Sequence, residues 1–123
     1  MLLLDTSFLV EYEAEVNARR VGPARSLMRS RPLEPLAVSV ISVGEVAEGF
    51  VSARDVDEFL TCFRVVGLSR AIAYRAAALQ SSLPQRLGEN DAWIAATALA
   101  YGATLVGRER AFERVPRLRY VAI

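Results

Sequence analysis

The stretch that decides the fold is residues 90–106, which read NDAWIAATALAYGATLV. From Asn90 to Tyr101 nearly every position is apolar and many are alanine, which predicts a helix packed tightly against a sheet. After Gly102, residues 104–106 form a short apolar run, as is typical of a strand buried on both faces. A helix that leads directly into a buried strand is the repeating unit of α/β domains.

The rest of the chain continues this alternation. Four further apolar runs predict strands, at residues 1–4, 36–41, 64–68 and 119–123. Apolar spacing, capping residues and prolines predict helices at residues 8–16, 23–30, 42–54, 55–63 and 69–83, with a short helical piece at 108–114. The length of 123 residues is typical of one domain. We therefore expect a single α/β domain over residues 1–123, built around a parallel sheet.

Composition excludes several kinds of chemistry. All 15 basic residues are arginine, because the chain has neither lysine nor histidine, and Cys62 is its single cysteine. The chain therefore has no Ser-His-Asp or Cys-His couple, no zinc finger, no Walker A loop and no Schiff-base lysine. Carboxylates remain as the catalytic groups. The net charge of +1 gives no strong reason to expect a nucleic-acid partner, although bound cations would make the surface more positive.

The sequence also predicts where the protein acts. The first apolar run contains Asp5 and has no basic start, so it is not expected to be a signal peptide. The longest uncharged stretch, residues 92–107, is shorter than the roughly 18 to 20 residues that span a bilayer. We expect a cytoplasmic protein without a membrane partner, in a reducing compartment.

Four acidic residues lie where predicted strands and helices meet. Asp5 ends the first strand, Glu45 lies in the first turn after the second, and Glu109 follows the fourth. Since the carboxyl ends of parallel strands share one edge of a sheet, these side chains are expected to meet there. Asp91 joins them if the helix that it opens begins at the same edge. An acid beside apolar runs is costly unless it is paired or holds a metal, so a divalent cation is the expected partner.

Three of these acids also have a purely local interpretation. Ser42 and Glu45 have the spacing of a capping box, in which the glutamate bonds a backbone N–H. Asp5 fits the N-cap of the first helix, and the helix dipole alone favours Asp91 at its position. The pattern leaves two hypotheses open, a set of helix caps and a shared metal site.

Four blocks follow one another from end to end: LLLDTSFLVEY, SVISVGEVAEGF, LGENDAWIAATALAYGATLVGRERAF and the closing strand. In order and spacing they resemble the PIN domain family, in particular the VapC-type ribonuclease toxins of bacterial toxin–antitoxin pairs. The resemblance implies a parallel five-stranded sheet with helices on both sides and an acidic pocket that binds Mg²⁺ or Mn²⁺. It implies that Asp5 and Asp91 are metal ligands, that Glu45 is a ligand or orients the attacking water, and that Glu109 acts through a water.

Two positions depart from the family's pattern. The family usually has Thr or Ser where this chain has Gly107, and Asp where it has Glu109. The absent hydroxyl removes a potential hydrogen bond, and the longer glutamate must fold back to reach the same ion. Ser7 is expected either to position water or phosphate or to be an ordinary helix cap.

The function predicted from these residues is a divalent-metal-dependent endoribonuclease, the toxin of a toxin–antitoxin pair. Its expected partners are RNA, a small antitoxin and a second copy of itself. Two alternatives stay open, a non-catalytic PIN-like module that binds RNA or a partner and a phosphatase of small molecules. The phosphatase is disfavoured because Ser7, and not a second acid, stands two residues after Asp5.

The two N-terminal helices are the expected contact surface. Arg25 and Arg29 share a helical face and are expected to contact RNA phosphates or an acidic partner, or to be merely solvated. By resemblance, an antitoxin would wrap an apolar groove here and place a basic side chain in the acidic pocket. These helices carry more apolar residues than a small domain is expected to bury, including Phe8, Val10, Leu27 and Met28.

Overall fold

The computed structural model describes residues 1–123 and contains one sheet of five strands. The strands are β1 (Leu2–Leu4), β2 (Leu36–Ser39), β3 (Arg64–Val66), β4 (Thr104–Gly107) and β5 (Tyr120–Ala122). They lie in the order β3-β2-β1-β4-β5, and every neighbouring pair is parallel. The predicted α/β class and five-stranded parallel sheet are therefore confirmed.

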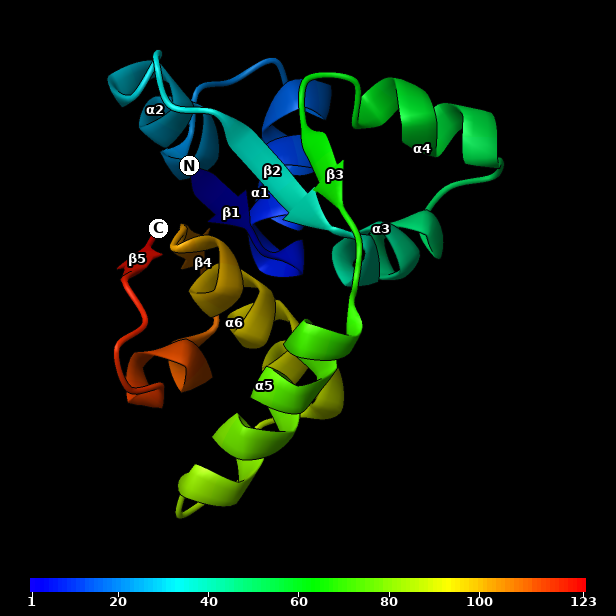
Figure 1. The fold of residues 1–123 in the computed structure, drawn as a ribbon. Coiled ribbons are helices and arrows are strands. Elements are labelled where there is room, and N and C mark those ends of the chain that lie inside the picture. The colour runs from blue at the N-terminus through cyan, green and yellow to red at the C-terminus, as the bar shows by residue number, and fades with distance from the viewer.

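Helices fill the connections between the strands (Figure 1). They are α1 (Thr6–Asn17), α2 (Pro23–Ser30), α3 (Val40–Ala47), α4 (Ala53–Phe59), α5 (Arg70–Ser82), α6 (Glu89–Tyr101) and the 3-10 helix η1 (Arg110–Arg114). No helix combines the length and the apolar character that crossing a bilayer requires.

The sheet separates two apolar cores. Leu3 of β1 faces a cluster that includes Ile94 of α6 and Leu105 of β4. Leu2 and Leu4 face the opposite cluster, which α1, α2, α3 and α4 help to form. Because successive side chains of a strand point to opposite faces, burial on both faces explains why β1 is apolar at every position.

Side-chain caps determine where most helices begin. The first backbone N–H groups of α1, α3, α4 and α5 are bonded by the side chains of Asp5, Ser39, Ser52 and Ser69. At the other end of α6, Gly102 takes a left-handed conformation with φ of 61°, which glycine adopts without strain. These caps fix the direction in which each helix leaves the sheet.

Some predicted boundaries were wrong, and caps explain the errors. The strand predicted at residues 36–41 ends at Ser39, whose hydroxyl oxygen accepts the N–H of residue 41 and starts α3. The two β-branched residues that follow lie in a helix, so the tertiary setting outweighs their strand preference. The helix predicted over residues 42–54 ends at Ala47, and the next helix is capped by Ser52.

Candidate active site

The four predicted acids all lie at the carboxyl ends of the strands. Asp5 stands between β1 and α1, Glu45 is on α3 directly after β2, and Glu109 follows β4 as the N-cap of η1. Asp91 lies in the first turn of α6. Since α6 leads into β4, its N-terminus begins at the edge toward which the strand arrows point in Figure 1. One edge of the sheet therefore carries all four side chains.

Asp5 is buried, with an exposed fraction of 2%. Its Oδ1 accepts hydrogen bonds from the backbone N–H of Phe8 at 2.8 Å and from the hydroxyl of Ser7 at 2.7 Å. The pKa of Asp5 is raised to about 6, chiefly by burial and in smaller part by the charges of Asp91 and Glu109, although the two hydrogen bonds lower it. The carboxylate thus caps a helix and also faces the charges of two other acids.

Asp91 is half-buried and accepts no hydrogen bond. Burial raises the pKa of its carboxyl group, and the charges of Glu109 and Glu45 raise it further. Asp5 faces the charges of Asp91 and Glu109, and Asp91 faces those of Glu109 and Glu45. The four carboxylates therefore form one electrostatically connected group.

A hydrogen bond from a residue of α1 fixes the side chain of Glu45. Its Oε1 accepts the hydroxyl of Thr6 at 2.7 Å, and the same hydroxyl oxygen lies 3.0 Å from Oγ of Ser42. Ser42 lies inside α3 and is fully buried, so it does not cap that helix. The capping-box interpretation of Glu45 is therefore wrong. The contact of Thr6 with Glu45 joins residues 39 positions apart and has no signal in the sequence pattern.

Ser7 connects Asp5 to the loop after β4. Its hydroxyl donates to Asp5 and its oxygen accepts the backbone N–H of Arg108 at 2.8 Å. The guanidinium of Arg108 lies 3.9 Å from Glu11, a buried carboxylate that Arg20 also approaches at 3.4 Å. These long-range contacts, across 101 residues for Ser7 and Arg108, have no signal in the sequence pattern.

None of the four site acids takes part in a salt bridge. An unpaired group of carboxylates is a donor set that suits hard divalent cations such as Mg²⁺ or Mn²⁺. In the side-chain arrangement of this structure, no three Asp, Glu, His or Cys residues lie close enough to hold one ion. The donor chemistry fits a cation, and ligation requires the more exposed carboxylates to rotate inward.

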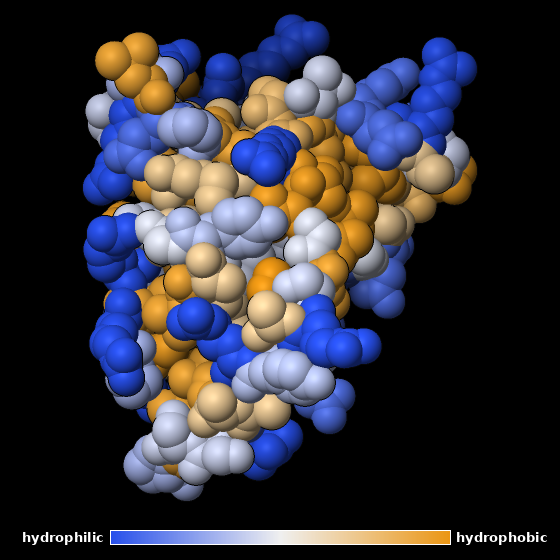
Figure 2. Space-filling model, in the orientation of Figure 1, coloured by the Kyte–Doolittle hydropathy of each residue, from blue (hydrophilic) through white to orange (hydrophobic).

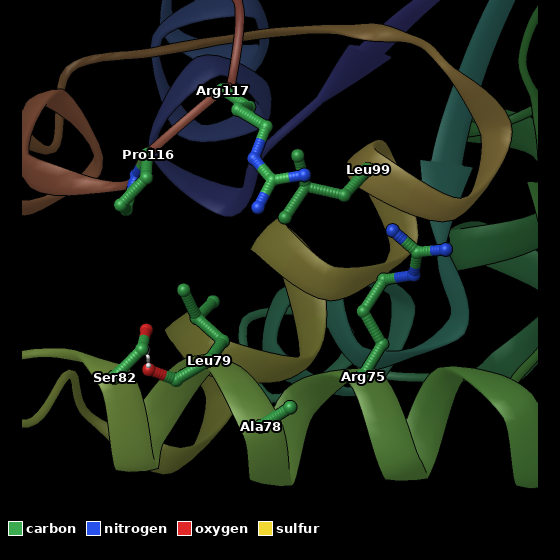
Figure 3. A pocket seen from close by; sticks show the side chains of 7 residues that line it. All are labelled: Arg75, Ala78, Leu79, Ser82, Leu99, Pro116 and Arg117. Atoms are coloured by element: carbon green, nitrogen blue, oxygen red, sulfur yellow. Dashed lines mark hydrogen bonds between the residues drawn. The ribbon is translucent and has the colours of Figure 1, made fainter.

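A hollow of about 450 Å³ opens beside this group and is lined by Glu45, Gly88, Glu89, Asn90 and Asp91. A second pocket, of about 280 Å³, lies between α5, the C-terminal end of α6 and the segment after η1. There the guanidinium groups of Arg75 and Arg117 lie near Leu99 (Figure 3). Because Leu99 and Asp91 stand at opposite ends of α6, this pocket is separate from the carboxylates.

Comparison with known families identifies the family of this chain. A sequence model described as PIN domain matches residues 2–118. The chain belongs to the PIN domain family. Ribonuclease VapC11 from Mycobacterium tuberculosis is 31% identical, with an alignment that covers 96% of this chain and 93% of that protein.

Solved structures share the PIN fold over nearly the whole chain. The VapBC2 structure from Rickettsia felis, bound to a DNA fragment from its promoter, aligns with a TM-score of 0.81 at 24% identity, covering 99% of this chain and 98% of that chain. A toxin-antitoxin complex from Klebsiella pneumoniae aligns with a TM-score of 0.74 at 26% identity, covering 98% and 96% of the two chains.

Tyr120 is a further polar residue beside the acids of this PIN domain. Its hydroxyl oxygen is buried and makes no hydrogen bond of normal geometry, although the backbone N–H of Glu109 lies near it. Burial raises the pKa of Tyr120, and so do the charges of Asp5 and Glu109. The sequence places this tyrosine in an ordinary apolar strand, so nothing in the pattern indicated that its hydroxyl faces the site.

The structure does not bring Arg25 and Arg29 to the carboxylates. Both lie on α2, which Figure 1 places away from the edge where α3 and the start of α6 meet. Arg25 donates to the backbone oxygen of Arg20 at 2.9 Å, and Arg29 is exposed. The expected apolar surface is also smaller than predicted, because Phe8 is fully buried in the core.

Proposed function

We propose that this PIN domain is a divalent-metal-dependent endoribonuclease and the toxin of a toxin–antitoxin pair. The observation that carries the proposal is the group of four unpaired, electrostatically connected carboxylates at the carboxyl edge of the sheet. The relative from Mycobacterium tuberculosis is named a ribonuclease and aligns with nearly the full length of this chain, which supports the proposal. Such a toxin acts on RNA in the cytoplasm, which agrees with the compartment expected from the sequence.

In this proposal Asp5 and Asp91 are the residues that would hold the ion. A bound Mg²⁺ or Mn²⁺ supplies an activated water and neutralises charge on the scissile phosphate. Asp5 offers Oδ2, because its Oδ1 already accepts the Phe8 N–H and the Ser7 hydroxyl. Asp91 has both oxygens free of hydrogen bonds, so no protein contact must break before it binds a cation.

The remaining residues orient the reacting groups. Glu45 is fixed by the Thr6 hydroxyl through one oxygen, which leaves the other to bind the ion or accept a proton from the attacking water. Glu109 is exposed and acts through a water. Ser7 is occupied on both sides, so its role is to hold Asp5 against the loop that carries Arg108. The half-exposed guanidinium of Arg108 is available to an RNA phosphate.

An antitoxin would cover the exposed apolar side chains at and after α1. Val10, Val16 and Val21 have exposed fractions of 60%, 43% and 48%, so they present apolar area that a partner could cover. An apolar segment of a small partner protein fits this surface. A basic side chain of the same partner would complement the unpaired carboxylates and block the site.

A second copy of the chain would cover another apolar area. Figure 2 shows apolar residues gathered over the part of the molecule where β3 lies. Val40, Val65 and Leu68 are the exposed large apolar residues of that region, and β3 is an edge strand. We propose a homodimer through this area. Light scattering on Val65→Glu tests it, because a charge at the interface should give a monomer where the parent gives a dimer.

Cleavage of RNA is the test of the proposed activity. The parent should cut RNA in Mn²⁺ and stop in chelator, and Asp5→Asn and Asp91→Asn should each lose about 100-fold or more in rate while staying folded. Asp57→Asn is the matched control, because this aspartate is exposed on α4. Full activity in a folded Asp5→Asn or Asp91→Asn variant would contradict the assignment. RNA binding without cleavage would favour the non-catalytic module, and turnover of free nucleotides would favour a phosphatase.

A further inference from the structure

The carboxyl group of Asp5, a candidate catalytic residue, fills the space beside Gly107. Gly107 is the last residue of β4 and lies next to the end of β1. A Cβ atom built on Gly107 would overlap the Cγ, Oδ1 and Oδ2 atoms of Asp5. The carboxyl group of Asp5 thus occupies the volume that a side chain at position 107 would need.

The backbone does not explain why a glycine stands here. Gly107 continues a regular parallel strand, and Gly102 is the glycine that has a left-handed φ. The surrounding backbone is also fixed, because the N–H of Asp5 donates to the oxygen of Val106 and the N–H of Ile123 donates to the oxygen of Gly107. The strands therefore cannot easily move apart to admit a side chain, and the position of the Asp5 carboxylate is what requires a glycine.

We propose that Gly107 is the positioning residue for Asp5, because its missing side chain lets the carboxylate lie against the end of β4. In that place Oδ1 accepts the Phe8 N–H and the Ser7 hydroxyl. Ser7 in turn accepts the N–H of Arg108, the residue after Gly107. The glycine, the aspartate and the serine thus form a closed set of contacts around the end of β4. The catalytic meaning of this arrangement rests on the proposed function.

A side chain at position 107 should weaken the site of this chain, whereas the family's pattern leads one to expect that a hydroxyl there supports it. In that pattern a hydroxyl at position 107 adds a hydrogen bond to the site. In this chain any Cβ at position 107, including that of serine, meets the carboxylate before its hydroxyl can bond it. Gly107→Ser should therefore weaken the site although it restores a residue usual in the family.

A double-mutant cycle without metal tests the steric claim. Gly107→Ala should lower the melting temperature of the parent by about 5 °C or more, because Asp5 must leave its cap. In an Asp5→Ala background the same change should have no cost, or should stabilise, since the overlapping atoms are gone. Gly67→Ala is the control, because a Cβ there has no atom within 4 Å. The amide NMR signal of Phe8, whose N–H donates to Asp5, should shift in Gly107→Ala and stay in place in Gly67→Ala.

A Mn²⁺ titration tests the consequence for the site. Gly107→Ala and Gly107→Ser should each bind Mn²⁺ at least 10-fold more weakly than the parent, and Gly67→Ala should bind it equally well. An unchanged Phe8 amide signal, an equal melting cost in both backgrounds, or tighter Mn²⁺ binding by Gly107→Ser would overturn the proposal. A parent that neither binds Mn²⁺ nor cleaves RNA overturns the proposed function, and the metal-free cycle then still decides the role of Gly107.

Discussion

Helix α1 carries a buried carboxylate near each end, and the two have opposite electrostatic settings. At the start, Asp5 has a pKa raised to about 6 by burial and by neighbouring acids. Near the end, Glu15 is fully buried, yet its pKa is lowered. Burial alone would raise the pKa of Glu15. Three hydrogen bonds to the Glu15 carboxylate outweigh this effect of burial. Their donors are the backbone N–H groups of Gly22, Ala24 and Arg25, at 2.8 to 2.9 Å.

The difference separates a structural carboxylate from a functional one. Glu15 has three donors and the nearby charge of Arg20, so its negative charge stabilises the junction of α1 and α2. Asp5 has two donors but faces the like charges of Asp91 and Glu109, so its ionised form is strained in the absence of a cation. The folded chain thus provides hydrogen-bond donors for Glu15 and leaves the charge of Asp5 for a ligand. The uncompensated charge of Asp5 lowers the stability of the fold.

The largest effect on stability is expected at the satisfied end of α1. Glu15→Ala leaves three backbone N–H groups without their acceptor and should lower the free energy of unfolding by about 3 kcal/mol, measured by urea denaturation. Glu13→Ala on the same helix is the control and should change it little. RNA cleavage per folded molecule should stay unchanged in Glu15→Ala, and a stability equal to that of the parent would show that the three bonds do not stabilise the fold.

The two carboxylates should also respond to pH with opposite sign. Between pH 7 and pH 5 in chelator, folded Asp5 takes up a proton near its pKa of about 6 while the unfolded chain, with a value of 3.8, does not. The free energy of unfolding should therefore rise by roughly 1 kcal/mol as the pH falls through this window. Below the ordinary value of 4.5, protonation of Glu15 removes stability as the pH falls further. Because the pKa of Asp91 is raised as well, Asp5→Asn should make the rise between pH 7 and pH 5 smaller without removing it, and a rise as large as that of the parent contradicts the assignment.

The smallest effect is expected at Tyr120. Its buried hydroxyl makes no hydrogen bond of normal geometry, so Tyr120→Phe should raise the free energy of unfolding by about 0.5 kcal/mol in chelator. If the hydroxyl serves the site only when a cation is present, the same variant will lose Mn²⁺ affinity without losing stability. A destabilised Tyr120→Phe variant would mean that the hydroxyl has a partner in the metal-free protein.

The sequence allowed the fold to be predicted because short apolar strands and capped helices leave local signals. Leu2, Leu3 and Leu4 indicate a central strand, and Ser69 and Pro84 bracket α5. The strand-to-helix junctions likewise indicate which acids stand at the carboxyl edge. The contacts of Thr6 with Glu45 and of Ser7 with Arg108 were not predictable, since they join residues 39 and 101 positions apart. The three bonds that satisfy Glu15 join residues only 7 to 10 positions apart, but they depend on how the chain turns between α1 and α2, which no local pattern shows.

The most direct test of a shared cation site is a set of melting curves for the parent and Asp91→Asn, each with chelator and with saturating Mn²⁺. Mn²⁺ at about 100 times its Kd should stabilise the parent by roughly 2.7 kcal/mol, because it binds the folded state and not the unfolded one. In chelator, Asp91→Asn should melt higher than the parent, since one repelling charge is gone, and it should gain little from Mn²⁺. A parent without a metal-dependent rise, or an Asp91→Asn variant with the same rise as the parent, would contradict the claim that these carboxylates share an ion.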